Sequence, residues 1–200
     1  MPNDSSTGGY LSPSSVNGDL NDQALADFLQ GIVVGITGLP GPMVRPRFQA
    51  EPPDPPDLGT NWAAIGPGQR KRDDYSTVKQ QAENTVVIRN RELEVLCSFY
   101  GPLAETNGEL LANGFEVPQN RETMRTQGFM LISGVAGPVI APAIIKGQWY
   151  YRADYSFWVR QQQQYTYPVL TLESAKATLD LQSPGASQLI QETLNVNAPL

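Results

Sequence analysis

The sequence predicts a domain that contains both helices and strands, in which the long strands run antiparallel. Three stretches support this prediction. Apolar and polar residues alternate along Arg91–Tyr100, as a half-buried strand requires. Apolar residues recur at helical spacing between Leu25 and Ile36. Alternation returns along Trp149–Arg160, and we expect Gln161–Gln164 to form a polar hairpin connection to a partner strand over Tyr165–Leu172.

The best amphipathic helix of the chain begins after Asn21. Either Asp19 or Asn21 is available as its N-cap, and either Gly35 or Gly38 as its end. We expect the helix to cover one face of a sheet. Its polar face contains no Lys or Arg, which disfavours the alternative of membrane binding. Its apolar face holds Leu25, Phe28, Leu29, Ile32, Val33 and Ile36.

Seven prolines make the next stretch, Leu39–Gly59, extended and stiff. An unstructured loop of this length is unusual inside a compact domain. We therefore expect an arm that lies on a neighbouring subunit, anchored by Arg45, Arg47 and Phe48. The alternative is a linker that follows its own domain.

Short strands are predicted on either side of a turn-rich segment. Asn61–Ile65 and Tyr75–Gln80 have strand-like composition, and Gly66–Asp74 between them is rich in turn residues. The β-branched stretch Thr85–Arg89 leads into the Arg91–Tyr100 strand, either directly or around a bend.

A Gly-Pro corner ends the central strand and begins two helices. Gly101 supplies free dihedral angles, and Pro102 suits a first helical position. Helical spacing then continues to Phe115, and a second helix is predicted from Pro118 to Gly128, before a strand over Phe129–Ile132.

The sequence contains no recognisable catalytic or metal-binding motif. It contains no His, and its single cysteine, Cys97, lies on the apolar side of its strand, so we expect a core residue. The glycine-rich segment Gly35–Gly41 lacks the Gly-Lys-Ser/Thr of a phosphate-binding loop. The sequence therefore predicts no catalytic residue, no metal ligand and no cofactor, and a protein that is not an enzyme.

The charge balance argues against a dedicated nucleic-acid-binding protein. The chain has 14 basic and 20 acidic residues, a net charge of −6, and its basic run Arg70–Arg72 is followed at once by two aspartates. The aromatic residues of Trp149–Arg160, with Arg152 and Arg160, leave open a site that stacks on sugars or single-stranded bases. The same alternation is what a packed sheet needs.

No segment is predicted to enter a membrane. The longest apolar stretch, Gly31–Leu39, is far shorter than the roughly 20 residues that cross a bilayer. The first residues lack the basic and then apolar organisation of a signal peptide. We expect a soluble protein that is intracellular when made.

Three stretches resemble the neck (tail) terminator proteins of long-tailed bacteriophages. The first is SFYGPLAETNGELLANGFEVPQNRETMRTQGFML, the second is GIVVGITGLPGPMVRPRFQAEPPDPPDLGTNWAAIG, and the third is the late strand QWYYRAD. Together they cover roughly residues 25–170. The similarity is one of overall pattern and contains no catalytic signature.

This resemblance implies an α+β domain with a mostly antiparallel sheet flanked by helices, long extended arms, and assembly as a homo-hexameric ring. It implies a structural virion protein that caps the tail tube, stops its polymerisation and joins the tail to the head. The implied partners are the tail tube protein and the head connector or stopper protein, with the tail sheath as a further candidate. DNA would pass through the lumen without sequence-specific binding, and the protein would be made in the host cytoplasm and reside in the virion neck.

Two alternative functions stay open. One is a head-completion or stopper ring, or another head–tail connector. The other is a carbohydrate- or nucleic-acid-binding module. For the domain organisation, we expect a flexible N-terminal arm over residues 1–18 and a terminator-like domain over 19–172, which contains the proline-rich arm 39–59. A C-terminal extension over 173–200 would be either an arm or a short helix.

The sequence also predicts where a subunit or partner interface lies. Exposed aromatic and Arg side chains supply most of the binding energy of protein interfaces. On this basis we expect Arg45, Arg47 and Phe48 of the proline-rich arm to lie in the interface, together with Tyr100 and Pro102 at the Gly-Pro corner.

Overall fold

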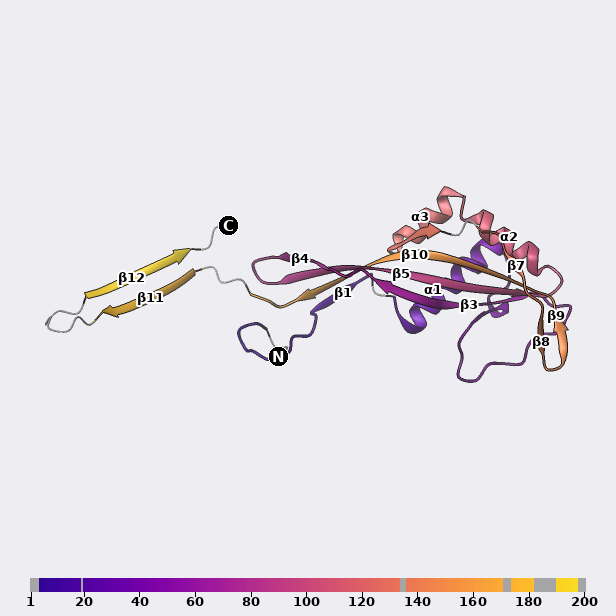
Figure 1. Ribbon diagram of the computed structural model, residues 1–200, viewed down its shortest axis with the longest axis horizontal. Coiled ribbons are helices and arrows are strands. Elements are labelled where there is room, and N and C mark those ends of the chain that lie inside the picture. The colour runs from indigo at the N-terminus through magenta and orange to yellow at the C-terminus, as the bar shows by residue number, and fades with distance from the viewer. Residues whose placement is uncertain (1–3, 19, 134–135, 171–173, 182–189, 198–200) are drawn as a thin grey trace. The chain divides into compact units, whose positions relative to one another are not determined.

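The computed structural model describes residues 4–18, 20–133, 136–170, 174–181 and 190–197 of the chain (Figure 1). The chain divides into two compact units. The larger unit contains Val16–Thr77 and Ile88–Tyr165. The smaller unit contains Met1–Ser15, Val78–Val87 and Thr166–Leu200.

An eight-stranded sheet forms the framework of the fold. Its strand order is β1-β10-β5-β3-β2, with β4 beside β5, and with β6 and β7 beside β10. β3 runs antiparallel to β5, and β6 and β7 run antiparallel to β10, whereas β2 runs parallel to β3. The strands are β1 (Ser15–Asn17), β2 (Val44–Pro46), β3 (Trp62–Arg72), β4 (Thr77–Gln80), β5 (Thr85–Tyr100), β6 (Phe129–Ser133), β7 (Val139–Ile140) and β10 (Arg152–Tyr167).

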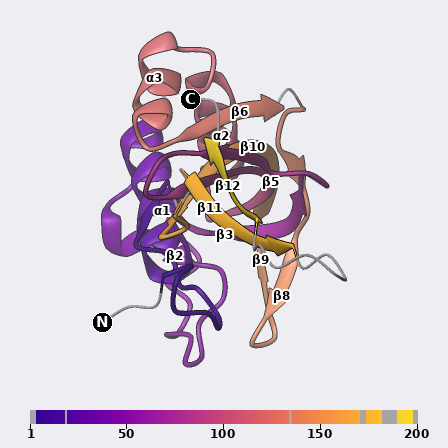
Figure 2. The ribbon, with the colours of Figure 1, turned by 90° about the vertical axis from the view of Figure 1, so that its left-hand side faces the viewer.

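Three helices, α1 (Asp22–Thr37), α2 (Ala104–Gly114) and α3 (Pro118–Thr126), pack against one face of this sheet (Figure 2). The odd-numbered residues of β5 and β10 point toward them, because side chains alternate between the two faces of a strand. Each large apolar side chain buried in this way contributes about 1.5–3 kcal/mol. The core residues include Leu29, Val33, Leu93, Val95, Phe99, Leu111, Phe115, Phe129, Tyr155 and Phe157.

The opposite face of the sheet, here called the open face, carries polar side chains. Even-numbered residues of β5 and β10 meet there: the Ser98 hydroxyl donates to Asp154 Oδ1 over 2.6 Å, and Arg160 forms ion pairs with Asp73 and Glu92. Lys71 lies over the Trp158 ring, 4.7 Å from its centroid. The predicted mostly antiparallel α+β sheet flanked by helices is thus present.

The helix ends follow the predicted signals. Gly38 adopts a left-handed φ of 73°, and its N–H donates to Val34 O over 3.0 Å, which ends α1. α3 begins at the predicted Pro118, and Gly128, with φ 79°, precedes β6. The first residue of α2 is Ala104, two positions after the predicted start at Pro102, because Gly101 and Pro102 form the turn that leads into it.

Two segments that the sequence predicts as connections belong to strands in the structure, so both predictions are wrong. β3 continues through Gly66–Arg72, with an irregularity between Pro67 and Arg70, so the predicted turn-rich segment is mostly sheet. β10 likewise continues through Gln161–Gln164 to Tyr167, so no hairpin connection and no return strand exist within the described residues up to 170. Leu172 lies outside the described residues.

The prediction of a hairpin connection over Gln161–Gln164 is wrong because two of these glutamines are buried in β10. Gln161 is fully buried, and its side chain is satisfied on both sides: Oε1 accepts from Arg91 Nε over 2.5 Å, and Nε2 donates to Gly18 O over 2.6 Å. Gln163 is buried as well. Polar residues can occupy a central strand when distant residues complete their hydrogen bonds.

The predicted strand Trp149–Arg160 is divided at Tyr151. Its first part belongs to β9 (Gln148–Tyr150), which pairs with β8 (Ala143–Ile145) in a separate two-stranded sheet. The short 3₁₀ helix η1 (Gly41–Met43) connects α1 to β2.

The smaller unit contains a further hairpin. β11 (Ser174–Leu181) and β12 (Ile190–Asn197) pair antiparallel, so the described residues of the C-terminal extension form strands and not the short helix that the sequence left open. The predicted break at Ser183–Gly185 lies outside the described residues. In the part of the chain that the structure describes, no helix has the length and apolar character needed to span a membrane.

Gly101 is the backbone position that we expect to be least tolerant of substitution. Its φ is 100°, and a Cβ there would lie 2.5 Å from Thr60 O. We predict that Gly101→Ala lowers the free energy of unfolding by roughly 2–4 kcal/mol, because it adds both strain and a clash with backbone. Urea unfolding followed by circular dichroism measures the change.

Gly31→Ala is the matched control for this substitution. Gly31 is exposed on α1, and an added Cβ meets nothing within 4 Å. The same chemical change should therefore stabilise the protein, by about 0.5–1 kcal/mol. If both variants changed the free energy of unfolding by the same amount, Gly101 would not be a constrained backbone position.

Candidate functional site

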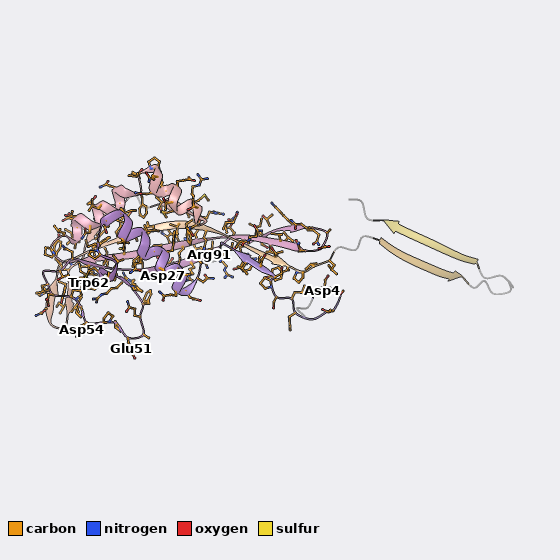
Figure 3. All side chains as sticks on the ribbon, turned by 180° about the vertical axis from the view of Figure 1, so that it is seen from behind. Asp4, Asp27, Glu51, Asp54, Trp62 and Arg91 are labelled. Atoms are coloured by element: carbon orange, nitrogen blue, oxygen red, sulfur yellow. The ribbon has the colours of Figure 1, made fainter. Side chains whose placement is uncertain are left out.

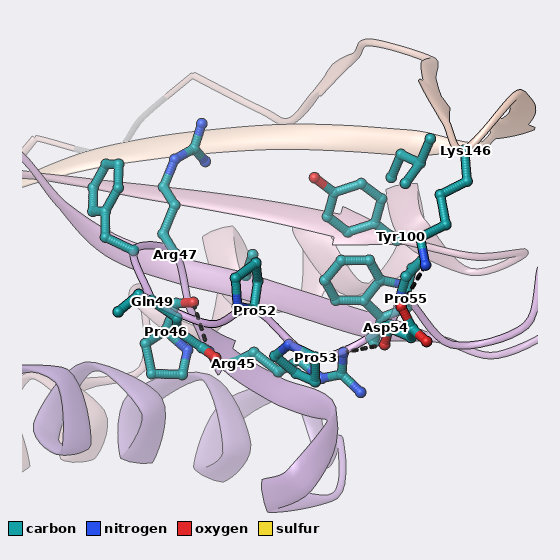
Figure 4. A pocket seen from close by; sticks show the side chains of 15 residues that line it. Arg45, Pro46, Arg47, Gln49, Pro52, Pro53, Asp54, Pro55, Tyr100 and Lys146 are labelled. Carbon is teal, nitrogen blue, oxygen red and sulfur yellow. Dashed lines mark hydrogen bonds and ion pairs between the residues drawn. The ribbon is translucent and has the colours of Figure 1, made fainter.

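A groove lies between the proline-rich segment and the open face of the sheet (Figure 4). Its volume is about 800 Å³. Four of the five predicted interface residues line it: Arg45, Arg47, Phe48 and Tyr100. Pro102 is not among the lining residues and lies exposed in the turn before α2.

Aromatic stacking forms one wall of the groove. Trp62 on β3 lies directly opposite Tyr100 on β5, and their rings stack with centroids 4.0 Å apart and planes 6° apart. The Arg45 guanidinium lies 5.5 Å from the Trp62 ring centroid, within the range of a cation–π interaction. Within the described part of the chain, the buried indole N–H of Trp62 has no hydrogen-bond partner.

Polar contacts hold the proline-rich segment against its own domain. Arg45 Nη1 donates to Asp54 O over 2.9 Å, and the Tyr150 hydroxyl donates to Pro56 O over 3.1 Å. The Lys146 ammonium forms an ion pair with the Asp54 carboxylate, at the same end of the larger unit as Trp62 (Figure 3). These contacts correspond to the alternative interpretation of this segment, a linker that follows its own domain.

A chain of hydrogen bonds fixes Arg47 on the open face. Its backbone N–H donates to Ile65 O over 2.7 Å, and its Nη1 donates to Ser98 Oγ over 2.8 Å. Ser98 in turn donates to Asp154, whose other carboxylate oxygen lies 3.0 Å from Arg152 Nη2. Ser98 is only 1% exposed, so the network links β5 and β10 beneath the segment.

Phe48 differs from the aromatic residues of the groove wall because its side chain is 72% exposed, whereas Trp62 is buried. It follows Arg47 directly, and its ring lies beside Gly66, where an added Cβ would be 3.7 Å from Phe48 Cδ2. Arg45, Arg47 and Tyr100 thus serve to hold the groove together, whereas Phe48 is presented to solvent. The groove therefore presents an exposed aromatic side chain, a type that is enriched in protein interfaces.

Asp54, Trp62 and Lys146 are among the groove residues that the sequence analysis missed. Trp62 is placed there by the β3–β5 register, and Lys146 by the tight turn between β8 and β9, where its φ is 49°. The Lys146–Gly147 pair before an aromatic strand was the available local signal for that turn. The pairing of Lys146 with Asp54 had no local signal.

Among the described residues, no cluster of three His, Cys, Asp or Glu side chains could hold a metal ion. Burial raises the pKa of the Cys97 thiol, which is 1% exposed and belongs to the core, as predicted.

The Asp54–Lys146 pair should be visible in the titration of Asp54. The hydrogen bond from Lys146 and its charge lower the pKa of the Asp54 carboxyl below its ordinary 3.8. The pair therefore favours the folded state above pH 3.8, and this contribution is lost as the pH falls through the lowered pKa. We predict that Lys146→Met raises the Asp54 pKa toward 3.8, as measured by carboxyl NMR.

Lys79→Met is the control for this titration, since Lys79 is exposed on β4 and does not line the groove. It should leave the Asp54 pKa unchanged. An unchanged Asp54 pKa in Lys146→Met would mean that the ion pair does not hold the segment in solution.

Comparison with protein families identifies the chain. Residues 22–182 match the family model described as phage neck terminator protein. No curated protein matches the chain. The match spans all three helices, β2 to β10 and the whole groove. It confirms the resemblance drawn from the sequence, and the chain belongs to the phage neck terminator protein family.

Proposed function

We propose that this protein forms a homo-hexameric ring at the head-proximal end of the phage tail tube, where it stops tube polymerisation and joins the tail to the head connector. The family match over residues 22–182 carries this proposal. A growing tube presents the same unfilled interface at its end after every addition. A ring that matches this interface on one face only would end the assembly.

The proposed partners are the tail tube protein on one face and the head connector or stopper protein on the other, with the tail sheath as a further candidate. DNA would pass through the lumen without sequence-specific contacts, which suits a net charge of −6. The proposed role is structural rather than enzymatic. The paired and buried polar groups of the groove support a binding surface.

The groove and its rim are the proposed contact region. The exposed members of the predicted interface set are Arg47, Phe48 and Pro102. The β8–β9 hairpin adds Ile144 and Trp149. These two residues lie directly opposite each other and are 61% and 68% exposed. Exposed apolar side chains beside a polar network are typical of a protein interaction site.

Particles assembled without this protein provide the direct test of termination and joining. We expect overlong or ragged tails beside unjoined, DNA-filled heads in negative-stain electron microscopy, because nothing would block the tube end. Tails of normal length that are merely unattached would contradict termination. They would favour the alternative function, a head-completion or stopper ring.

Phe48→Glu tests the proposed contact region. Placing a charge on an exposed anchor should reduce the yield of joined particles by about tenfold or more, while the thermal unfolding midpoint stays unchanged, because the ring of Phe48 is 72% exposed. Infectious titre and microscopy measure the yield.

Tyr75→Glu is the control, because Tyr75 is 90% exposed, is aromatic as well and lies outside the groove. It should support normal joining. Equal losses in the two variants would show that the groove rim has no special role.

A further inference from the structure

The groove carries more positive than negative charge, although the chain as a whole has a net charge of −6 (Figure 4). Among the described residues that line it, Arg45, Arg47 and Lys146 are basic and Asp54 is acidic. Lys146 pairs with Asp54, whereas neither Arg45 nor Arg47 forms an ion pair with a carboxylate in the described part of the chain. Two guanidinium groups are therefore available to a negatively charged occupant.

Each of these guanidinium groups is held in place by a single contact to an oxygen of its own chain. Arg45 Nη1 donates to Asp54 O, and Arg47 Nη1 donates to Ser98 Oγ. Further N–H donors of both side chains stay free for another acceptor. An occupant with carboxylates would meet donors that are already positioned, which lowers the entropic cost of binding.

The wall of the groove that the proline-rich segment forms also offers main-chain groups. In the described part of the chain, the backbone N–H and C=O groups of Phe48, Gln49 and Ala50 have no hydrogen-bond partner. An extended peptide supplies both acceptors and donors to such a wall, and main-chain hydrogen bonds of this kind give affinity in peptide recognition. The volume of about 800 Å³ suits a short stretch of chain rather than a single ion.

The aromatic wall of the groove is occupied from within the chain. Tyr100 stacks on the Trp62 ring at 4.0 Å, and the Arg45 guanidinium lies 5.5 Å from the centroid of the same ring. Single-stranded nucleic acids bind by stacking their bases on free aromatic faces. Because Trp62 is already engaged by both neighbours, the groove favours an acidic peptide over a nucleic acid.

One extended segment of the chain itself has the matching chemistry, but it is already in use. Residues 51–57 contain three acidic residues and four prolines. This segment forms part of the groove wall, where Arg45 and Lys146 hold Asp54. It cannot fill the groove that it helps to form, and the same holds for the identical segment of a second copy. The occupant is therefore a segment of a different protein.

We propose that the groove binds an extended, acidic segment of another protein of the phage particle. Its carboxylates pair with Arg45 and Arg47, and its main chain follows residues 48–50. This inference rests on the proposed function in the phage neck and names the chemistry of one contact with a partner. Main-chain bonds supply affinity, and charge pairing selects an acidic segment.

Binding of short probes to the full-length protein tests this chemistry. The probes are a fluorescein-labelled octapeptide of alternating proline and glutamate, the same peptide with lysine in place of glutamate, and an octanucleotide of thymidine. Fluorescence anisotropy should show saturable binding of the glutamate peptide alone, and added salt should weaken it. No binding of the glutamate peptide, or equal binding of either other probe, would overturn the proposal.

Substitutions locate the binding in the groove. Arg47→Gln removes one guanidinium, and Ala64→Phe fills the groove from β3 while every charge stays in place. Each should weaken binding of the glutamate peptide by about tenfold or more. Arg121→Gln, which removes an exposed charge on α3 outside the groove, is the matched control and should bind as the wild type does. Circular dichroism verifies that each variant is folded. Unchanged binding in both groove variants would overturn the proposal.

Photo-cross-linking in assembled particles identifies the occupant. Ala50 lines the groove and is exposed, so p-benzoylphenylalanine in its place samples whatever lies there. Mass spectrometry should find a link to another virion protein, within a stretch in which acidic residues outnumber basic ones. Thr123, exposed on α3, is the control position and should give no link to that stretch. A link from position 50 to a second copy, to DNA or to a basic stretch, or no link at all, would overturn the proposal.

The two proposals fail in different ways. Overlong tails in particles that lack the protein, together with an empty groove in the cross-linking experiment, would overturn the groove contact and leave termination standing. Tails of normal length in those particles would contradict termination. Binding of the glutamate peptide to the isolated protein does not depend on tail length, so it would still report on the groove.

Discussion

One-sided burial of the sheet is the constraint on which the rest of the structure depends. The odd-numbered residues of β5 and β10 face three helices and are fully buried, from Leu93 to Phe99 and from Ala153 to Val159. Because a strand alternates its side chains, this burial also determines which residues face the other way. The open face therefore receives Ser98, Asp154 and Arg160, whose charges and hydroxyls pair across the strands. Everything that the protein exposes on this side is built on that polar layer.

Local periodicity was sufficient to predict the core and insufficient to predict the limits of the strands. The alternation of Arg91–Tyr100 and the helical spacing of Leu25–Ile36 identified buried residues correctly, because both patterns reflect burial directly. The glutamines of β10 carry no such signal. Gln161 is tolerated in the sheet only because Arg91 and Gly18, far away in the sequence, complete its hydrogen bonds. A polar run that is satisfied from a distance looks like a loop when only its neighbours in the sequence are considered.

The candidate site, too, could be predicted from local sequence only in part. The exposed aromatic and Arg residues of the proline-rich segment could be recognised by type, and the fold does bring Arg45, Arg47 and Phe48 to one groove with Tyr100. Their roles depend on long-range pairing. Trp62 reaches Tyr100 through the β3–β5 register, and Lys146 reaches Asp54 from a turn that lies 92 positions further along the chain. No local pattern indicates which Arg stacks, which one bonds to a buried serine, and which aromatic residue stays exposed.

The way in which the segment is anchored would make an exposed Phe48 an effective contact, as proposed above. Arg47, immediately before it, is fixed by Ile65 and Ser98, and Asp54, six positions after it, is fixed by Arg45 and Lys146. Prolines at positions 52 and 53 restrict the chain between these anchors. A side chain held on a segment that is tied at both ends loses little conformational entropy when a partner binds, and so retains more of its contact energy as affinity. In the proposed assembly, the internal polar contacts would order the segment before a partner binds, and the exposed ring of Phe48 would form the contact.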